Sequence, residues 1–142
     1  MSLSKFLRGS DICLLVYAVD DEQSFDNLDT WKREFLYYAD VKDADTFPFV
    51  LIGNKSDLEN HEVRQEQVEG WCAANGNMKC FETSAKNSSN VEQAFIASVE
   101  RWLTHEQTLD KQSKSGANYN TSVNLGKRGS TSKQSAEKSC CS

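Results

Sequence analysis

Three short apolar runs alternate with three amphipathic stretches, and this alternation constrains the fold more than any other feature of the sequence. The runs are ICLLVYAV at 12–19, FPFVLIG at 47–53 and MKCFETSA at 78–85. Apolar runs of this length, with β-branched and aromatic residues, indicate buried strands. A strand followed by a helix, repeated three times, implies parallel strands joined by right-handed crossovers. The sequence therefore predicts an α/β fold: a parallel sheet with helices on both faces.

The three helical stretches are identified by apolar residues three or four positions apart. In the first, over 20–40, Asp21 or Ser24 caps the start, and the predicted buried stripe is Phe25, Leu28, Trp31 and Phe35. In the second, Asn75-Gly76 ends the helix, and the predicted stripe is Val63, Val68, Trp71 and Cys72. In the third, Ser89 and Glu92 form a capping box, and the predicted buried face is Val91, Ala94, Phe95, Ser98, Val99, Trp102 and Leu103.

From about residue 106 the helical periodicity stops, and Ser, Lys, Asn, Gly, Gln and Thr dominate. This composition is typical of disorder, so we expect a folded domain at 1–105 and a disordered tail at 106–142. The domain carries 10 basic and 18 acidic side chains, and the tail carries 6 basic and 3 acidic ones. An acidic body argues against nucleic acid as a partner. The weakly basic tail is compatible with an anionic membrane surface.

The five cysteines show no disulfide-framework spacing; they are Cys13, Cys72, Cys80, Cys140 and Cys141. An odd count of this kind favours a reducing compartment, with the first three as small apolar residues. The longest apolar run is far shorter than the roughly 20 residues of a membrane-spanning helix. No signal peptide is visible. We therefore expect a cytosolic chain.

Two polar loops follow the second and third predicted strands, at Asn54–Asp57 and at Thr83–Lys86. Ligands of open parallel sheets bind beyond the carboxyl ends of the strands, so we expect these loops to meet. An ionised Asp57 has two acceptor oxygens, and guanine presents two adjacent donors, its ring N–H and its exocyclic amine. Adenine has no such pair, and an unmatched buried polar group is rejected by a factor of about 10⁴ or more.

Neighbouring side chains complete this hypothetical guanine site. Asn54 can bond the purine edge and tie the loops together, and the alkyl stem of Lys55 can lie flat over the base. Ser84 can brace the carboxylate, and the N–H of Ala85 can donate to a carbonyl such as guanine O6. The alternative without a binding function is an ordinary polar turn after a strand, since an isolated N-K-x-D motif is weak evidence for a guanine site. Two motifs behind parallel strands, about 30 residues apart, favour the guanine site.

RGSDICLLVYAVDDEQSFDNLDTWKREF, GNKSDL and ETSAK follow one another in the chain, and together they cover roughly residues 3–105. In this the sequence resembles the small GTPases of the Ras superfamily, most closely the Rab branch. EFLYYADV with FPFVLIGNK, and TSVNL in the tail, resemble the Rab-nine subgroup. The resemblance implies a P-loop small-GTPase fold that binds GTP or GDP, with guanine-specificity loops formed by Asn54, Lys55, Asp57, Ser84, Ala85 and Lys86.

The same resemblance implies a switch in vesicle-mediated and intracellular protein transport, from late endosome to trans-Golgi. The implied location is the cytosol and the cytoplasmic face of those membranes. The implied partners are effectors, an exchange factor, a GDP-dissociation inhibitor and a prenylation escort protein.

The motif G-x-x-x-x-G-K-[ST], which cradles the phosphates and Mg²⁺ in this family, does not occur in the sequence. The switch I threonine, the D-x-x-G motif and the water-orienting glutamine do not occur either, and MSLSKFLRGSD resembles the end of switch II. We therefore expect a C-terminal portion that keeps the last three strand-helix units, with no catalytic residue and no metal ligand. Its first strand, 12–19, would be an unpaired apolar edge. We expect such a chain to be unstable or partly folded alone, to bind nucleotide weakly, and to lack enzymatic activity by itself.

The chain ends in KSCCS, and Rab tails resemble this ending, with geranylgeranyl groups on both cysteines, here Cys140 and Cys141. Two lipids matter because one anchors only marginally. There is no CaaX box, since the fourth residue from the end is Ser139. A strained vicinal disulfide and a two-thiol metal site are weaker readings, and an exposed pair without function is a further alternative.

Two other functions stay open at this level. One is a non-catalytic, truncated interaction fragment that titrates partners. The other is a nucleotide-binding α/β domain without specificity for GTP.

Overall fold

The computed structural model describes residues 4–116 of the 142-residue chain. The chain divides into two units, Met1–Thr108 and Leu109–Ser142, and the sheet lies in the first. The elements in chain order are α1 (Ser4–Leu7), β1 (Cys13–Ala18), α2 (Glu22–Asp26), α3 (Leu28–Ala39), β2 (Phe49–Asn54), α4 (Gln65–Ala74), β3 (Lys79–Glu82) and α5 (Val91–Gly116).

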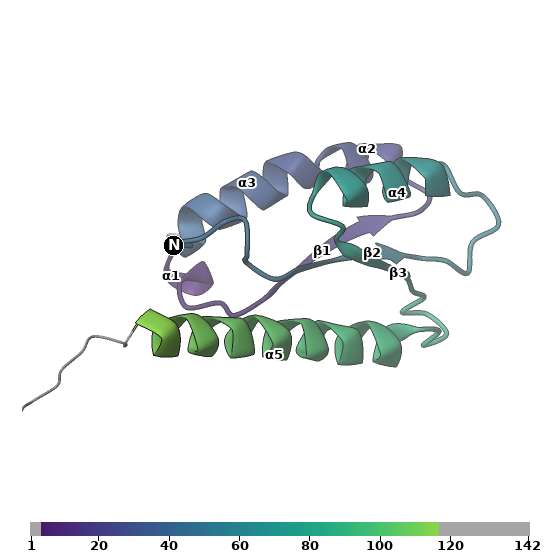
Figure 1. Ribbon diagram of the computed structural model, residues 1–142. Helices are drawn as coiled ribbons and strands as arrows, with labels where there is room; N and C mark the ends of the chain where they lie inside the picture. The colour runs from purple at the N-terminus through teal and green to yellow at the C-terminus, as the bar shows by residue number, and fades with distance from the viewer. Residues whose placement is uncertain (1–3, 117–142) are drawn as a thin grey trace, which may run out of the picture. The chain divides into compact units, whose positions relative to one another are not determined.

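The sheet has the order β1-β2-β3, and both strand pairs are parallel. The register places Leu15 beside Leu51, and Leu51 beside Cys80. Helices α2, α3 and α4 lie on one face of this sheet, and the part of α5 within the first unit, up to Thr108, lies on the other (Figure 1). The predicted α/β fold with parallel strands and helices on both faces is therefore confirmed.

The central strand β2 carries the core, because five consecutive residues, Phe49–Gly53, are buried. Alternate side chains of β2 point to opposite faces. Leu51 therefore joins the larger cluster under α3 and α4, which also contains Leu15, Leu28 and Cys72. Val50 and Ile52 join the smaller cluster with Ala94 of α5. Burial on both faces explains why this strand reads as a continuous apolar run.

The first predicted helix is two helices, because the chain turns at Asn27 between α2 and α3. Asp21 caps α2, since its carboxylate accepts the N–H of Ser24 at 3.2 Å. Phe25, Leu28 and Phe35 are buried as predicted. The prediction for Trp31 is wrong, because this side chain is 56% exposed. It lies beside the outer edge of β1, where no further strand pairs within residues 4–116.

The second predicted helix is α4, and it ends as expected. Asn75 is the C-cap, and Gly76 follows with a φ of 77°. Such a left-handed residue is typically glycine because it has no Cβ. Val63 is buried as predicted but precedes the helix.

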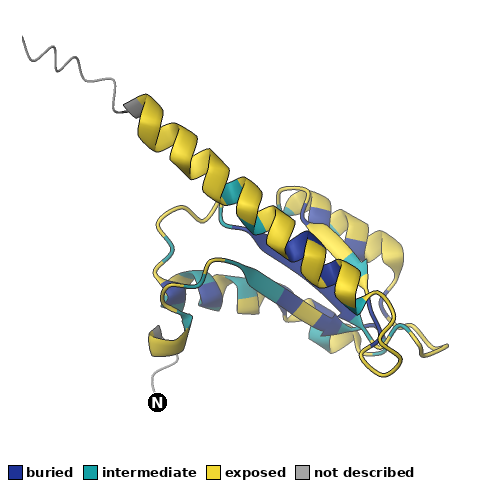
Figure 2. Ribbon diagram, turned by 90° about the horizontal axis from the view of Figure 1, so that it is seen from below, coloured by how far each residue is buried: buried dark blue, intermediate teal, exposed yellow. Residues whose placement is uncertain are grey.

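The third predicted helix is α5, and its buried face is narrower than its sequence indicates. Ala94 and Ser98 are buried, whereas Phe95, Val99 and Leu103 are 55%, 53% and 44% exposed. Figure 2 shows the exposed residues along most of this helix. The predicted capping box is also wrong, because α5 starts at Val91 and the carbonyl of Asn90 accepts its first helical bond. The described sheet has three strands, so it covers only part of the apolar face of the helix.

The predicted disordered tail is wrong for residues 106–116, which continue α5. Their Glu, Gln, Leu and Lys side chains are good helix formers, and the hydroxyl of Thr108 donates to the carbonyl of Thr104. The segment TSVNL and the pair Cys140-Cys141 lie outside the described residues. Within 4–116, no helix has the length and apolar character needed to cross a bilayer.

Candidate functional site

The loops after β2 and β3 are joined by backbone hydrogen bonds. The N–H of Thr83 donates to the carbonyl of Gly53 at 2.8 Å, and the N–H of Ser56 donates to the carbonyl of Thr83 at 3.0 Å. Parallel pairing of β2 with β3 ends at Gly53 and Glu82, so both loops leave the sheet at the same edge. The predicted meeting of the two polar loops is confirmed.

Asn54 links the loops through its side chain. Its Oδ1 accepts the hydroxyl of Thr83 at 3.3 Å and the N–H of Ala85 at 3.1 Å. The prediction that Asn54 ties the loops together is therefore confirmed. The N–H of Ala85, predicted to donate to a carbonyl such as guanine O6, donates to Oδ1 of Asn54 in this structure. With Oδ1 occupied, the amide nitrogen of Asn54 is the group left to meet a purine edge.

Asp57 is braced from below by Ser84. The hydroxyl of Ser84 donates to Oδ1 of Asp57 at 2.5 Å, and Ser84 is fully buried. Ser84 is itself held by a backbone bridge to Ser89. The hydrogen bond from Ser84 is the main cause that lowers the pKa of Asp57. Desolvation opposes it, and a backbone hydrogen bond and the positive charge of Lys86 lower the pKa further. The carboxylate is therefore ionised and fixed in orientation at neutral pH.

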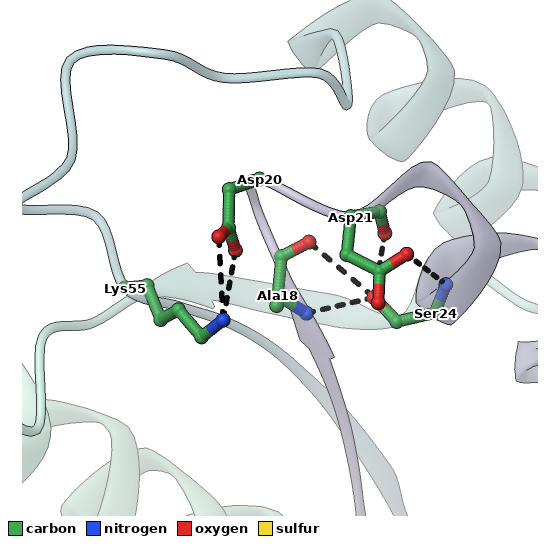
Figure 3. A network of polar contacts seen from close by, with 5 residues as sticks. All are labelled: Ala18, Asp20, Asp21, Ser24 and Lys55. Atoms are coloured by element: carbon green, nitrogen blue, oxygen red, sulfur yellow. Dashed lines mark hydrogen bonds and ion pairs between the residues drawn. The ribbon is translucent and has the colours of Figure 1, made fainter.

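Lys55 adopts a left-handed backbone conformation with a φ of 68°. Its carbonyl accepts the N–H of Leu58 at 3.1 Å, which closes the turn. Its ammonium lies 3.1 Å from Oδ1 and 3.3 Å from Oδ2 of Asp20, at the end of β1 (Figure 3). The side chain thus runs from the turn toward the neighbouring strand.

These residues surround a cleft of about 270 Å³, lined by Asn54, Lys55, Asp57, Leu58, Ala85 and Lys86. Five of the six residues predicted for a guanine site line it, and Ser84 lies beneath it. A larger hollow of about 350 Å³ beside β1 is lined mainly by apolar side chains, with Glu34 as its one charged lining residue. That hollow offers no pair of groups suited to a nucleobase edge, so the smaller cleft is the candidate site.

Sequence reasoning assigned no role in the site to Asp20 or Leu58, and none to the Thr83 hydroxyl. Asp20 could have been recognised because it lies just after the first strand. It is two residues beyond Ala18, which pairs with Asn54 in the sheet. Carboxyl ends of adjacent parallel strands meet, so a carboxylate there was in reach of the loop. Leu58 gave no signal, because a single apolar residue in a loop is common.

Comparison with known proteins agrees with this geometry. The family model described as Ras family matches residues 2–104. Ras-related protein Rab-9A of Rattus norvegicus is 53% identical over 105 residues, which is 74% of this chain and 52% of the relative. Ras-related protein Rab-9B of Mus musculus is 52% identical over 105 residues, again 74% of this chain and 52% of the relative. Ras-related protein Rab7 of Cenchrus ciliaris is 48% identical over 104 residues, 71% of this chain and 50% of the relative.

The chain spans about half the length of the curated relatives it matches. The family model, in contrast, covers most of the chain, including both loops and all three strands. The protein therefore belongs to the Ras family, and the relatives named above are Rab proteins, two of them Rab-9 proteins.

Proposed function

We propose that the cleft between the two loops binds guanine, as the base-reading site of a Rab-type small GTPase. The observation that carries this proposal is the carboxylate of Asp57, held by the buried hydroxyl of Ser84 at the wall of a cleft of nucleobase size. A fixed, ionised carboxylate accepts two parallel hydrogen bonds, which matches the ring N–H and exocyclic amine of guanine.

The other lining groups suit a planar base. The amide nitrogen of Asn54 donates to an acceptor on the purine edge. The alkyl stems of Lys55 and Lys86 provide apolar surface for the ring faces, since long basic side chains bury their stems and keep their charges in water. Adenine would leave Asp57 without donors inside the cleft, and that mismatch sets the specificity.

In the complete function we propose a switch in vesicle-mediated and intracellular protein transport, with GTP and GDP as ligands and Mg²⁺ at the phosphates. The proposed route is late endosome to trans-Golgi, on the cytoplasmic face of those membranes. Effectors, an exchange factor, a GDP-dissociation inhibitor and a prenylation escort protein are the proposed partners. Prenylation of Cys140 and Cys141 is the proposed anchor. The residues of this chain supply the base contacts and no phosphate-binding motif.

The test is an NMR titration of the 142-residue chain with GMP and with AMP, which carry the same phosphate charge. We expect GMP to shift the amide signals of 54–58 and 84–87 and to bind at least about tenfold more tightly than AMP. Asp57→Asn should remove this preference. Asp26→Asn, at an exposed carboxylate of α2, is the matched control and should keep it. Equal affinity of the wild-type chain for GMP and AMP would contradict the proposal.

A second candidate function is the non-catalytic interaction fragment, and the outer edge of β1, which no strand pairs within residues 4–116, favours it. Val16 on this strand is 55% exposed, Trp31 beside it is 56% exposed, and Phe95 of α5 is 55% exposed. Apolar surface of this kind marks interaction sites. Binding of Rab partners by the chain at equal strength in GMP, AMP and nucleotide-free buffer would support this second function.

A further inference from the structure

The ion pair between Lys55 and Asp20 has no role in the base contacts described above. It joins the turn of the guanine-binding loop to the end of β1, on the side away from β3. Figure 3 shows the Lys55 side chain extended toward Asp20. The ammonium is therefore held at a fixed place relative to the cleft that the stem of Lys55 lines.

Asp20 is itself held firmly, because the turn that carries it is bonded on both sides. The N–H of Val19 donates to the carbonyl of Asn54 at 3.0 Å, and the carbonyl of Val19 accepts from Glu62 and Val63. On the other side, the hydroxyl of Ser24 donates to the carbonyl of Asp21 at 2.6 Å and accepts the N–H of Ala18 at 2.9 Å (Figure 3).

The negative charge of the Asp20 carboxylate is compensated by Lys55. Its Oδ1 is inaccessible to solvent and has no hydrogen-bond donor among the described residues, so the Lys55 ammonium at 3.1 Å is what compensates its charge. An unpaired buried carboxylate oxygen is unfavourable, so the pair favours one position of the lysine.

We infer that Asp20 is a positioning residue of the base-binding cleft. It keeps the ammonium of Lys55 at the rim, so that the aliphatic stem and not the charge faces the base. Without Asp20, the nearest alternative carboxylate in the cleft is Asp57, and a lysine paired with Asp57 would compete with the guanine donors. This inference rests on the proposed function of the cleft.

The experiment measures GMP and AMP affinities of the full chain by NMR titration for four proteins: wild type, Asp20→Asn, Lys55→Met and the double variant. Asp20→Asn should weaken GMP binding about two- to fivefold, the scale of a partly exposed ion pair. Lys55→Met removes the competing charge, so adding Asp20→Asn to it should cause no further loss. This coupling is the readout that a general loosening of the loop would not produce.

Asp21→Asn is the matched control. The carboxylate of Asp21 caps α2 and makes no ion pair with Lys55. Asparagine caps a helix equally well, so GMP affinity should stay at the wild-type value. Asp20→Asn should also keep the ratio of GMP to AMP affinity, because Asp57 is intact. Equal GMP affinity of wild type and Asp20→Asn would overturn the inference. So would a loss of GMP affinity on Asp20→Asn that is the same with Lys55 present as in Lys55→Met. A wild-type chain that binds no GMP would overturn the proposed function and this inference with it.

Discussion

The buried hydroxyl of Ser84 donates a 2.5 Å hydrogen bond to Oδ1 of Asp57, across 27 positions of sequence. Asp57 is exposed and Ser84 is not. The donor is thus fixed by the core while the acceptor faces the cleft. The orientation of the carboxylate is therefore set by a residue at the edge of the sheet.

Ser84→Ala should raise the pKa of Asp57 toward its ordinary value of 3.8, because the hydroxyl is the largest cause of the depression. A depressed carboxyl pKa in the folded state stabilises the fold above the ordinary pKa, and this contribution is lost as the pH falls through the folded pKa. In the variant this contribution should be smaller, because the folded pKa lies closer to the ordinary value. A carboxyl-carbon NMR titration of Asp57 measures this. Ser56→Ala, in the same loop, is the control, and an unchanged Asp57 pKa in Ser84→Ala would contradict the assignment.

Gly53→Ala should destabilise the chain by about 1–3 kcal/mol, the cost of overpacking a core. A Cβ at this position would lie 2.6 Å from the hydroxyl oxygen and 2.7 Å from Cζ of Tyr17. The Tyr17 ring cannot yield easily, because it is buried and stands edge-on to Phe25. Urea unfolding measures the free-energy change.

Gly70→Ala is the matched control for Gly53→Ala. It lies inside α4 with nothing within 4 Å of the new Cβ. Alanine in a helix interior is favoured over glycine by roughly 0.5–1 kcal/mol, so this variant should be more stable than wild type. Equal unfolding free energies for the two variants would show that Tyr17 does not limit the space at Gly53.

Thiol alkylation at pH 8 should separate the cysteines of the described region. Burial raises the pKa of Cys13 to about 12 and that of Cys72 to about 12, so few of these thiols are ionised. Cys80 is exposed on β3. Since the thiolate is the nucleophile, peptide mass mapping after iodoacetamide should find Cys80 modified first. Cys13 and Cys72 should react only in urea, and their early modification in native buffer would contradict the described core.

Val16→Lys should reduce self-association of the chain with little change in its unfolding free energy. Val16 lies on β1, which pairs only with β2 within residues 4–116, and the side chain is 55% exposed. A charged residue on an open edge strand disfavours edge-to-edge pairing. Sedimentation velocity at rising protein concentration measures the change. Thr30→Lys, at an exposed position of α3, should leave the self-association unaltered.

The sequence by itself determined the order of strands and helices, the parallel sheet and the two loops of the candidate site. Each of these follows from local patterns: the apolar run of β2, the cap at Asp21, the stop at Gly76 and the chemistry of an Asn-Lys-x-Asp turn. Asp57 and Ser84 were paired correctly because both follow adjacent parallel strands, and such ends meet.

Only the tertiary structure decided which apolar faces are covered and how the loop is held. Periodicity identifies the face of a helix but not the extent of the surface opposite it, so Trp31 and Phe95 were expected in the core and are exposed. The N–H of Ala85 donates to Asn54, and the ammonium of Lys55 pairs with Asp20. Both contacts form because the register of the three strands brings these groups close together. Such contacts join residues more than 30 positions apart, and their geometry depends on sheet register that no local pattern records.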